Sequence, residues 1–214
     1  MKVEIWSDVV CPWCYIGKRR FEAALAGFEQ ADEVELVWRS FELDPDAPRA
    51  QEGSSLEHLA GKYGMSLEQA RAAQDRVSEL AQAEGLDYRL AETRRGNSFD
   101  AHRLLHLARA RGAQDVLKER LMHAYFSEGS PIAEPDVLER LGVEAGLERA
   151  EVAETLAGDR FAEEVRDDER RARALGIRAV PFFVIDERFG IEGAQPSASI
   201  LDALRHAAAA GAVS

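Results

Sequence analysis

Both cysteines of this 214-residue chain lie in one short stretch, residues 7–17, which reads SDVVCPWCYIG. Two cysteines placed at random in a chain of this length would stand three positions apart in roughly one case in a hundred, so the spacing of Cys11 and Cys14 is informative in itself. A pair at this spacing can close a small disulfide, which makes reversible redox chemistry the first hypothesis for the motif.

The residues on either side place the motif at the junction of a strand and a helix. Residues 3–8, VEIWSD, are typical of a strand, and two valines lead out of it. Beyond the motif, apolar residues recur at helical spacing between charged ones, at Tyr15, Ile16, Phe21, Leu25 and Phe28. Pro12 suits the first turn of this helix, because its missing N–H is not needed there.

This position has a consequence for the acidity of the thiols. The unpaired N–H groups and the dipole at a helix N-terminus stabilise a negative charge. We therefore expect Cys11, at the exposed end of the motif, to have a thiol pKa of about 3.5–7.5 instead of about 8.5. Cys14, one turn further along, is expected to be more buried and to resolve mixed disulfides.

Two other uses of the cysteines are less favoured. A structural zinc site needs four ligands, and the chain has no second cysteine pair to complete one. Two inert core cysteines would not account for the spacing at a strand–helix junction. The motif therefore predicts a redox pair and no metal site.

The composition excludes several classes of protein. The chain is 46% hydrophobic and 31% charged, which is ordinary for a globular protein. Its 39 acidic and 27 basic residues give a net charge of −12, which disfavours binding to nucleic acid. No apolar run reaches the roughly 18 residues of a membrane span. The charged start, MKVE, lacks the apolar core of a signal peptide, so a reducing cytoplasm is the expected compartment.

The rest of the chain divides into a second strand, a long helical block and a final strand pair. Residues 34–41, VELVWRSF, read as a strand that a proline-rich turn ends. The next block is rich in Ala, Leu, Glu and Arg, and we predict helices over 55–63, 66–84, 98–111, 113–128, 135–142, 149–157 and 160–175. After Gly176 the pattern predicts strands over 177–186 and 189–192 and a last helix from Ser197.

This order predicts an α/β fold in two parts. Residues 1–48 and 176–214 would form one discontinuous sheet-based domain, and 49–175 an all-helical insertion domain. Pro181 fits best as the first residue of its strand, after a tight turn. On the residues alone a trans bond is the default there, because cis X-Pro bonds are uncommon.

Taken together, these patterns resemble the DsbA-like branch of the thioredoxin superfamily, and within it the FrnE-type oxidoreductases. The resemblance spans essentially the full length of the chain. Four stretches carry it: residues 7–17 (SDVVCPWCYIG), 97–104 (NSFDAHRL), 176–184 (GIRAVPFFV) and 193–196 (GAQP).

The resemblance implies a thioredoxin-like fold with a large helical insertion, and a thiol–disulfide oxidoreductase or isomerase that acts through the CPWC dithiol. It also implies a cis bond before Pro181, with Val180 and Pro181 against the Cys11 sulfur. There the Val180 backbone could pair with an extended substrate. The FrnE type is named for a protein of a polyketide antibiotic pathway, so a link to secondary metabolism or stress response is expected.

A related branch offers an alternative. The 2-hydroxychromene-2-carboxylate isomerases and kappa-class glutathione transferases share this architecture and a similar Asn…Ala-His-Arg stretch. They normally carry a serine where this chain has Cys11, and they lack the second cysteine. The presence of Cys11 and Cys14 therefore favours dithiol chemistry over a glutathione-dependent small-molecule isomerase or transferase.

Four further residues are candidates for the site. Asp8 is expected to shape the strand–helix turn, with proton handling near the thiols as the alternative. Asn97 is expected to cap the helix that begins at the next residue, or else to line the substrate cleft. His102 shares a helix face with a second histidine four residues on, but no third ligand joins them, so packing is favoured over metal binding. Trp13 is expected to form part of the contact surface and to tune the disulfide potential.

These expectations define the cofactors and partners. We expect no tightly bound cofactor besides the redox-active disulfide, with glutathione as a candidate co-substrate. The substrate would be a polypeptide or small molecule that contains a disulfide or a thiol. Because the cytoplasmic glutathione pool would keep a strong oxidant reduced, reductase or isomerase activity is favoured over net oxidation. A non-enzymatic binding module with a vestigial motif is the third hypothesis.

Overall fold

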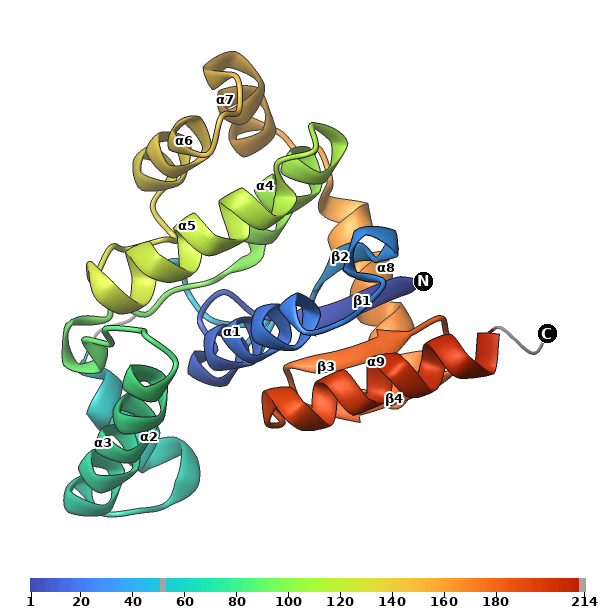
Figure 1. Cartoon of the computed structure of the whole chain (residues 1–214). Coiled ribbons are helices and arrows are strands. Elements are labelled where there is room, and N and C mark those ends of the chain that lie inside the picture. The colour runs from blue at the N-terminus through green and yellow to red at the C-terminus, as the bar shows by residue number, and fades with distance from the viewer. Residues whose placement is uncertain (51–52, 212–214) are drawn as a thin grey trace.

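A four-stranded mixed sheet lies at the centre of the computed structural model, which describes residues 1–50 and 53–211. Its strands are β1 (Lys2–Ser7), β2 (Glu35–Ser40), β3 (Phe182–Ile185) and β4 (Phe189–Glu192), in the order β2-β1-β3-β4. β1 is parallel to β2 and antiparallel to β3, which is antiparallel to β4. The two ends of the chain therefore build one sheet, as the sequence predicts (Figure 1).

Alternation along β1 distributes its side chains between the two faces of the sheet. Val3 and Ile5 are buried with apolar residues of α1 (Pro12–Ala26) and α9 (Ser197–Gly211), which cover one face. Trp6 points to the other face, where its indole N–H donates to the backbone oxygen of Asp168 in α8 (Ala162–Ala174), 2.9 Å away. The central strand is thus buried on both sides.

The other helices belong to the long middle segment of the chain. They are α2 (Ser55–Tyr63), α3 (Leu67–Ala83), α4 (Phe99–Ala110), α5 (Gln114–Ser127), α6 (Pro135–Glu144) and α7 (Arg149–Ala157). Short 3-10 turns lie between α1 and β2 (Ala31–Glu33) and between α3 and α4 (Leu90–Glu92). Local chemistry fixes two helix starts, because Ser54 and Ser66 each form a reciprocal capping box with the residue three positions on. In Figure 1, α2 and α3 form a pair at one end of the molecule. Helix α3 contacts α1, and α5 reaches α1 through the Tyr15–Glu119 hydrogen bond.

The predicted elements agree with the structure except at one place. The seven predicted helices of the middle segment all form, with bounds that differ by at most two residues. The predicted strand over 177–186 is wrong in extent, because only Phe182–Ile185 pairs with β1. Residues 177–181 instead form a loop whose apolar side chains, Ile177 and Val180, are buried in the apolar core that contains Trp6 and Leu104. A continuous apolar run does not distinguish a buried loop from a buried strand.

Helix α8 lies against the sheet as well as against the helical segment. It contacts both β2 and α4, and Figure 1 places it behind β1 and β2. The division into residues 1–48 with 176–214 and an insertion of 49–175 stays a prediction; residues 51–52 and 212–214 of those ranges lie outside the described residues. In the part of the chain that the structure describes, no helix has the length and apolar character that a membrane crossing requires.

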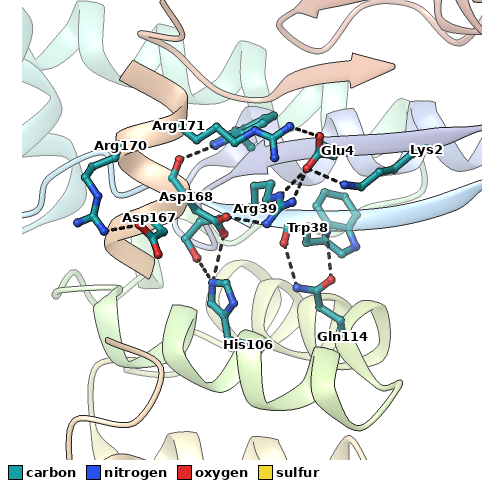
Figure 2. A network of polar contacts seen from close by, with 12 residues as sticks. Lys2, Glu4, Trp38, Arg39, His106, Gln114, Asp167, Asp168, Arg170 and Arg171 are labelled. Atoms are coloured by element: carbon teal, nitrogen blue, oxygen red, sulfur yellow. Dashed lines mark hydrogen bonds and ion pairs between the residues drawn. The ribbon is translucent and has the colours of Figure 1, made fainter. Parts of the chain in front are cut away.

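The buried carboxylate of Asp168 joins α8 to β2 and α4. Asp168 accepts hydrogen bonds from the Ser40 backbone N–H and from Arg39 Nη1, both at 2.9 Å, and lies 3.2 Å from His106 Nε2. Figure 2 shows this carboxylate between α8, β2 and α4. Burial opposes its ionisation, but the hydrogen bonds from His106 and the Ser40 N–H and the charge of Arg39 outweigh burial and lower its pKa. The hydrogen bonds and the charge of Arg39 at this junction therefore favour the ionised form of Asp168 despite its burial.

Replacing Asp168 with alanine should lower the free energy of unfolding by about 3 kcal/mol, because it removes the buried acceptor of the Ser40 N–H and His106 and leaves the partly buried guanidinium of Arg39 with an incomplete set of acceptors. Asp167→Ala is the matched control: the Asp167 carboxylate is exposed and pairs with Arg170 on the surface (Figure 2), so its removal should change stability by about 0–1 kcal/mol. Urea unfolding of both variants measures the difference. Because the pKa of Asp168 is lowered on folding, its contribution should disappear as the pH falls below the ordinary aspartate range. Equal losses in the two variants would contradict the assignment.

Candidate active site

The cysteine motif begins at the junction of β1 and α1. Cys11 occupies the N-cap of α1 with an extended backbone (φ −91°, ψ 115°), and Pro12 is the first helical residue. The Cys11 N–H donates to the backbone oxygen of Asp8 at 3.3 Å, which closes the turn between strand and helix. The predicted strand–helix placement of the motif is confirmed.

The two sulfurs differ in burial and in neighbours. Both cysteines are free thiols; Cys11 keeps 4% of its surface exposed, and Cys14 none. The Cys11 Sγ lies 3.6 Å from the backbone oxygen of Val180, and the Val180–Pro181 peptide bond is cis. The loop before β3 therefore meets the first turn of α1, where the family resemblance placed it.

Close packing holds the two segments together. A Cβ atom at Gly17 of α1 would lie only 2.8 Å from Cγ of Pro181. The Pro181 backbone oxygen also accepts the Gly193 N–H at 2.8 Å, so the loop is held from both sides. Gly17 is required here for its lack of a side chain, inside a helix where glycine is otherwise unfavourable.

Aromatic rings from the middle segment support the motif on another side. The Tyr88 hydroxyl donates to the backbone oxygen of Pro12 at 2.7 Å, which occupies one carbonyl of the first helical turn. Its ring stacks on Tyr15 of α1 at 6.1 Å and on Phe126 of α5 at 4.8 Å between centroids. Sequence reasoning missed Tyr88, because nothing in its local pattern indicates a contact with residues more than 70 positions away.

Asp8 lies fully buried under the junction. Its carboxylate accepts the Val10 N–H at 3.4 Å and the Leu43 N–H at 2.8 Å, and lies 3.3 Å from His102 Nε2. Burial opposes its ionisation, but hydrogen bonds from His102 and from the Leu43 N–H outweigh burial and lower its pKa. Asp8 thus shapes the turn and also carries a negative charge near the thiols.

Asn97 and His102 take different places. Asn97 accepts the Phe99 N–H at 2.8 Å at the start of α4, and its side-chain amide donates to the Pro45 oxygen at 3.3 Å. His102 is buried, and its Nδ1 has no hydrogen-bond partner within the described residues. Its neighbour His106 contacts Asp168 instead, so the two histidines serve separate polar clusters. Over residues 1–50 and 53–211, no three His, Cys, Asp or Glu side chains are arranged to hold a metal ion.

Trp13, between the two cysteines, is directed outward. Its side chain is 40% exposed, one of the few large apolar side chains on the surface. Such a ring beside a reactive sulfur can contact a bound substrate. Its effect on the disulfide potential stays a prediction.

The acidity of the two thiols differs from the sequence expectation. The pKa of Cys11 is raised, because its S–H donates a hydrogen bond to the Cys14 sulfur and because it is buried. The pKa of Cys14 is lowered: burial opposes ionisation, but the Cys11 S–H, the charge of Lys118, the Ser7 hydroxyl and the Asp8 N–H outweigh it. The expectation of a low pKa at Cys11 is thus wrong for the reduced pair. That expectation considered only the helix N-terminus, whereas the Cys11 S–H, the charge of Lys118 in α5 and the Ser7 hydroxyl of β1 favour a thiolate at Cys14.

A thioredoxin-like sheet, a vicinal dithiol at a helix N-terminus and a cis-proline loop beside it define a thioredoxin-fold protein with a large helical segment. The chain belongs to the DSBA-like thioredoxin domain family, whose pattern matches residues 2–205, and is a DsbA-like thiol–disulfide oxidoreductase.

Solved structures of similar proteins share this fold. A probable DsbA oxidoreductase from Streptomyces coelicolor is 47% identical, with a TM-score of 0.93 over 97% of this chain and 89% of that one. The cytosolic disulfide reductase DsbM from Pseudomonas aeruginosa shares the fold at 21% identity and a TM-score of 0.65, over 96% and 99% of the chains. A 2-hydroxychromene-2-carboxylate isomerase also shares it, at 13% identity and a TM-score of 0.71, over 99% and 98%.

Adding one methyl group at Gly17 should disturb the site. Gly17→Ala places a carbon against Pro181, so we expect a loss of about 1–3 kcal/mol in the free energy of unfolding and slower reaction of the dithiol with disulfides. Gly61→Ala in α2 is the matched control, since nothing lies within 4 Å of its Cβ, and it should stabilise the protein by about 0.5–1 kcal/mol. Thermal unfolding and stopped-flow thiol kinetics measure both. A fully stable and reactive Gly17→Ala protein would show that the loop does not depend on this contact.

Proposed function

We propose that the protein reduces or isomerises disulfides through Cys11 and Cys14. The observation that carries this proposal is the position of two free thiols at the start of α1, with the Val180 backbone oxygen 3.6 Å from the Cys11 sulfur. Cys11 is the more accessible sulfur of the pair, so it is the one that a substrate reaches first.

The proposed reaction has two exchange steps. The Cys11 thiolate forms when its proton passes along the hydrogen bond to Cys14, and it attacks one sulfur of a substrate disulfide. A mixed disulfide forms, and the other substrate sulfur leaves as a thiolate. Cys14 then gives up the proton that it received and attacks Cys11 Sγ as a thiolate, which closes the Cys11–Cys14 disulfide. The second substrate sulfur leaves as a thiolate and takes up a proton. The substrate gains two electrons and the protein loses two.

A polypeptide fits the surroundings of the sulfur as substrate. The backbone of Val180 can pair with an extended chain, a mode of binding that accepts many sequences. Trp13 adds an exposed aromatic surface at the same place. Asp8 and His102 are proposed to support the site from within, because the buried Asp8 carboxylate lies under the strand–helix junction and contacts His102. Asn97 binds the Pro45 oxygen and the Phe99 N–H, and its place in a substrate cleft stays a prediction.

Turnover as a reductase needs a thiol donor, and we propose one of the glutathione class. The fold neighbour DsbM is also known as a structure with glutathione, which motivates the choice of donor. A reducing compartment such as the cytoplasm suits this direction, since an oxidant there would lose its disulfide to the thiol pool. Membership of the FrnE type, with a role in secondary metabolism or stress response, stays a prediction.

The alternative, a glutathione-dependent isomerase or transferase, is supported by the fold it shares with 2-hydroxychromene-2-carboxylate isomerase. The hollow beside Tyr88 argues against a dedicated glutathione site there. This cavity of about 660 Å³ is lined by Asp75, Glu79 and Asp87, and glutathione carries a net negative charge. Carboxylates without a cationic partner in the lining repel such a ligand.

The activity itself can be tested with two protein substrates. Wild-type protein should reduce insulin disulfides and refold scrambled ribonuclease, and Cys11→Ser should lose both activities, because it removes the attacking sulfur. Cys14→Ser retains the attacking sulfur and should accumulate a mixed disulfide that mass spectrometry detects. A wild-type protein no more active than Cys11→Ser in both assays would refute a protein-disulfide function.

Glutathione binding separates the two candidates. Titration of reduced glutathione into the Cys11→Ser protein should give no saturable heat by calorimetry, because this variant cannot form a covalent adduct and the proposal requires no resident glutathione. Wild-type protein carrying the Cys11–Cys14 disulfide should instead be reduced by glutathione in the same buffer. Saturable binding to Cys11→Ser would favour the isomerase or transferase.

A further inference from the structure

Lys118 of α5 is a buried cation close to the cysteine pair. Its side chain is fully buried, and its Nζ donates to the backbone oxygen of Ser7 at 3.2 Å. Among the residues that the structure describes, no carboxylate lies within ion-pair distance of this Nζ. A buried ammonium without an anionic partner is costly in free energy, so another group near Lys118 must compensate its charge.

A second buried lysine shows the ordinary arrangement. Lys18 of α1 is 2% exposed and forms ion pairs with Glu22, Asp115 and Glu119. These carboxylates compensate its burial, and they raise its pKa against the effect of desolvation. Lys118 has no such set, so the group that balances its charge must be another one.

The groups that face Lys118 identify the missing anion. The negative or ionisable groups near it are Cys14 and Cys11 of α1 and Asp8 at the end of β1, Lys18 is the nearby cation, and the Trp38 ring lies 5.4 Å from Nζ. Asp8 is already engaged by His102 and by backbone N–H groups. The cysteine pair is the remaining source of negative charge.

Ser7 gives an independent indication from the other side. Its backbone oxygen accepts the Lys118 ammonium, and its buried hydroxyl has no hydrogen-bond partner within the described residues of the reduced protein. That hydroxyl is placed to stabilise a thiolate at Cys14. One residue of β1 thus holds Lys118 and presents an unused donor to the same sulfur.

We propose that Lys118 is a positioning residue that takes up the proton of Cys14 and holds the resulting thiolate, so that Cys14 can resolve the mixed disulfide. This inference rests on the proposed exchange reaction. Lys118 does not touch the substrate; it acts through Cys14.

The proton and electron balance of the step is closed. In the mixed disulfide, the Cys14 S–H gives its proton to the neutral amine of Lys118, which leaves a thiolate beside an ammonium. The thiolate attacks Cys11 Sγ, the Cys11–Cys14 bond forms, and the bond from Cys11 to the substrate sulfur breaks. The substrate thiolate leaves and takes a proton from water, while Lys118 loses its proton to solvent before the next cycle.

The acidity of Lys118 suits this exchange. Burial lowers its pKa to about 8, against the opposing charges of Cys14, Asp8 and Cys11. Near neutral pH the Lys118 amine is therefore unprotonated in roughly one molecule in ten, whereas an ordinary lysine is unprotonated in far fewer. The proton can then pass in either direction between the amine and the thiol.

A stopped-flow experiment with an aromatic disulfide, 5,5′-dithiobis(2-nitrobenzoate), separates the two exchange steps. Attack by Cys11 releases one coloured thiolate, and resolution by Cys14 releases the second. In Lys118→Met we expect the second release to slow on the order of 10- to 100-fold at neutral pH. Its pH midpoint should also move upward, and the deficit should shrink at alkaline pH, where Cys14 ionises unaided.

Two further variants control for loss of packing. Lys118→Gln keeps a donor for the Ser7 oxygen without a charge, and should show the same slow second release even if Lys118→Met folds poorly. Arg120→Met removes a cation from the same helix whose partners, Glu128 and Glu144, lie on the surface, and it should leave the pH midpoint unchanged. Thermal unfolding establishes that each variant is folded.

The outcomes distinguish this inference from the proposed function. If folded Lys118→Met and Lys118→Gln show the wild-type rate and pH midpoint of the second release, Lys118 has only a structural role and the inference fails. If the wild-type protein itself gives no second release and forms no Cys11–Cys14 disulfide, the exchange reaction fails first. A slow second release with an unchanged pH midpoint would also overturn the assignment, because it would indicate displaced packing.

Discussion

The contact between Pro181 and Gly17 is the constraint on which the rest of the site depends. It joins the loop before β3 to the first helix at a separation that admits no side chain at Gly17. The Val180 oxygen consequently lies beside the Cys11 sulfur instead of pairing in the sheet. The same contact explains why the apolar run 177–186 is not one strand. Its first half packs against α1 and the core, and only its second half pairs with β1.

The helical segment is tied to this centre through buried polar groups as well as apolar packing. Asp168 joins α8 to β2 and α4, and Asp8 joins the end of β1 to α4 through His102 (Figure 2 shows the first of these). Hydrogen bonds have strict geometry, so such pairs fix the register of the helices more narrowly than apolar contacts do. Gln114 of α5 bonds the backbone N–H and oxygen of Trp38 in β2 in the same way, and this holds the helix that carries Lys118.

How far the sequence could predict this arrangement depends on how far apart along the chain the interacting residues lie. The cysteine spacing, Pro12 at the helix start and the strand before it are local, and they were sufficient for the motif and the order of elements. The role of Lys118 was not predictable, because a lysine in a charged helix is typical of a solvent-facing position. The pKa order of the cysteines failed for the same reason: it depends on donors brought from β1 and α5 by the tertiary fold.

The middle segment of the chain therefore contributes groups to the site as well as covering it. Tyr88 binds the first turn of the cysteine helix, and Lys118 lies behind the second cysteine, whereas α1 and the loop before β3 supply the sulfurs and the Val180 backbone. A change in the packing of α5 would alter the charge beside Cys14 without any change in the motif. One unit of pKa corresponds to about 1.4 kcal/mol, so a change in this charge would alter the balance of the thiolate between the two sulfurs. Proteins that share the CPWC sequence can accordingly differ in redox behaviour through residues that lie a hundred positions away from it.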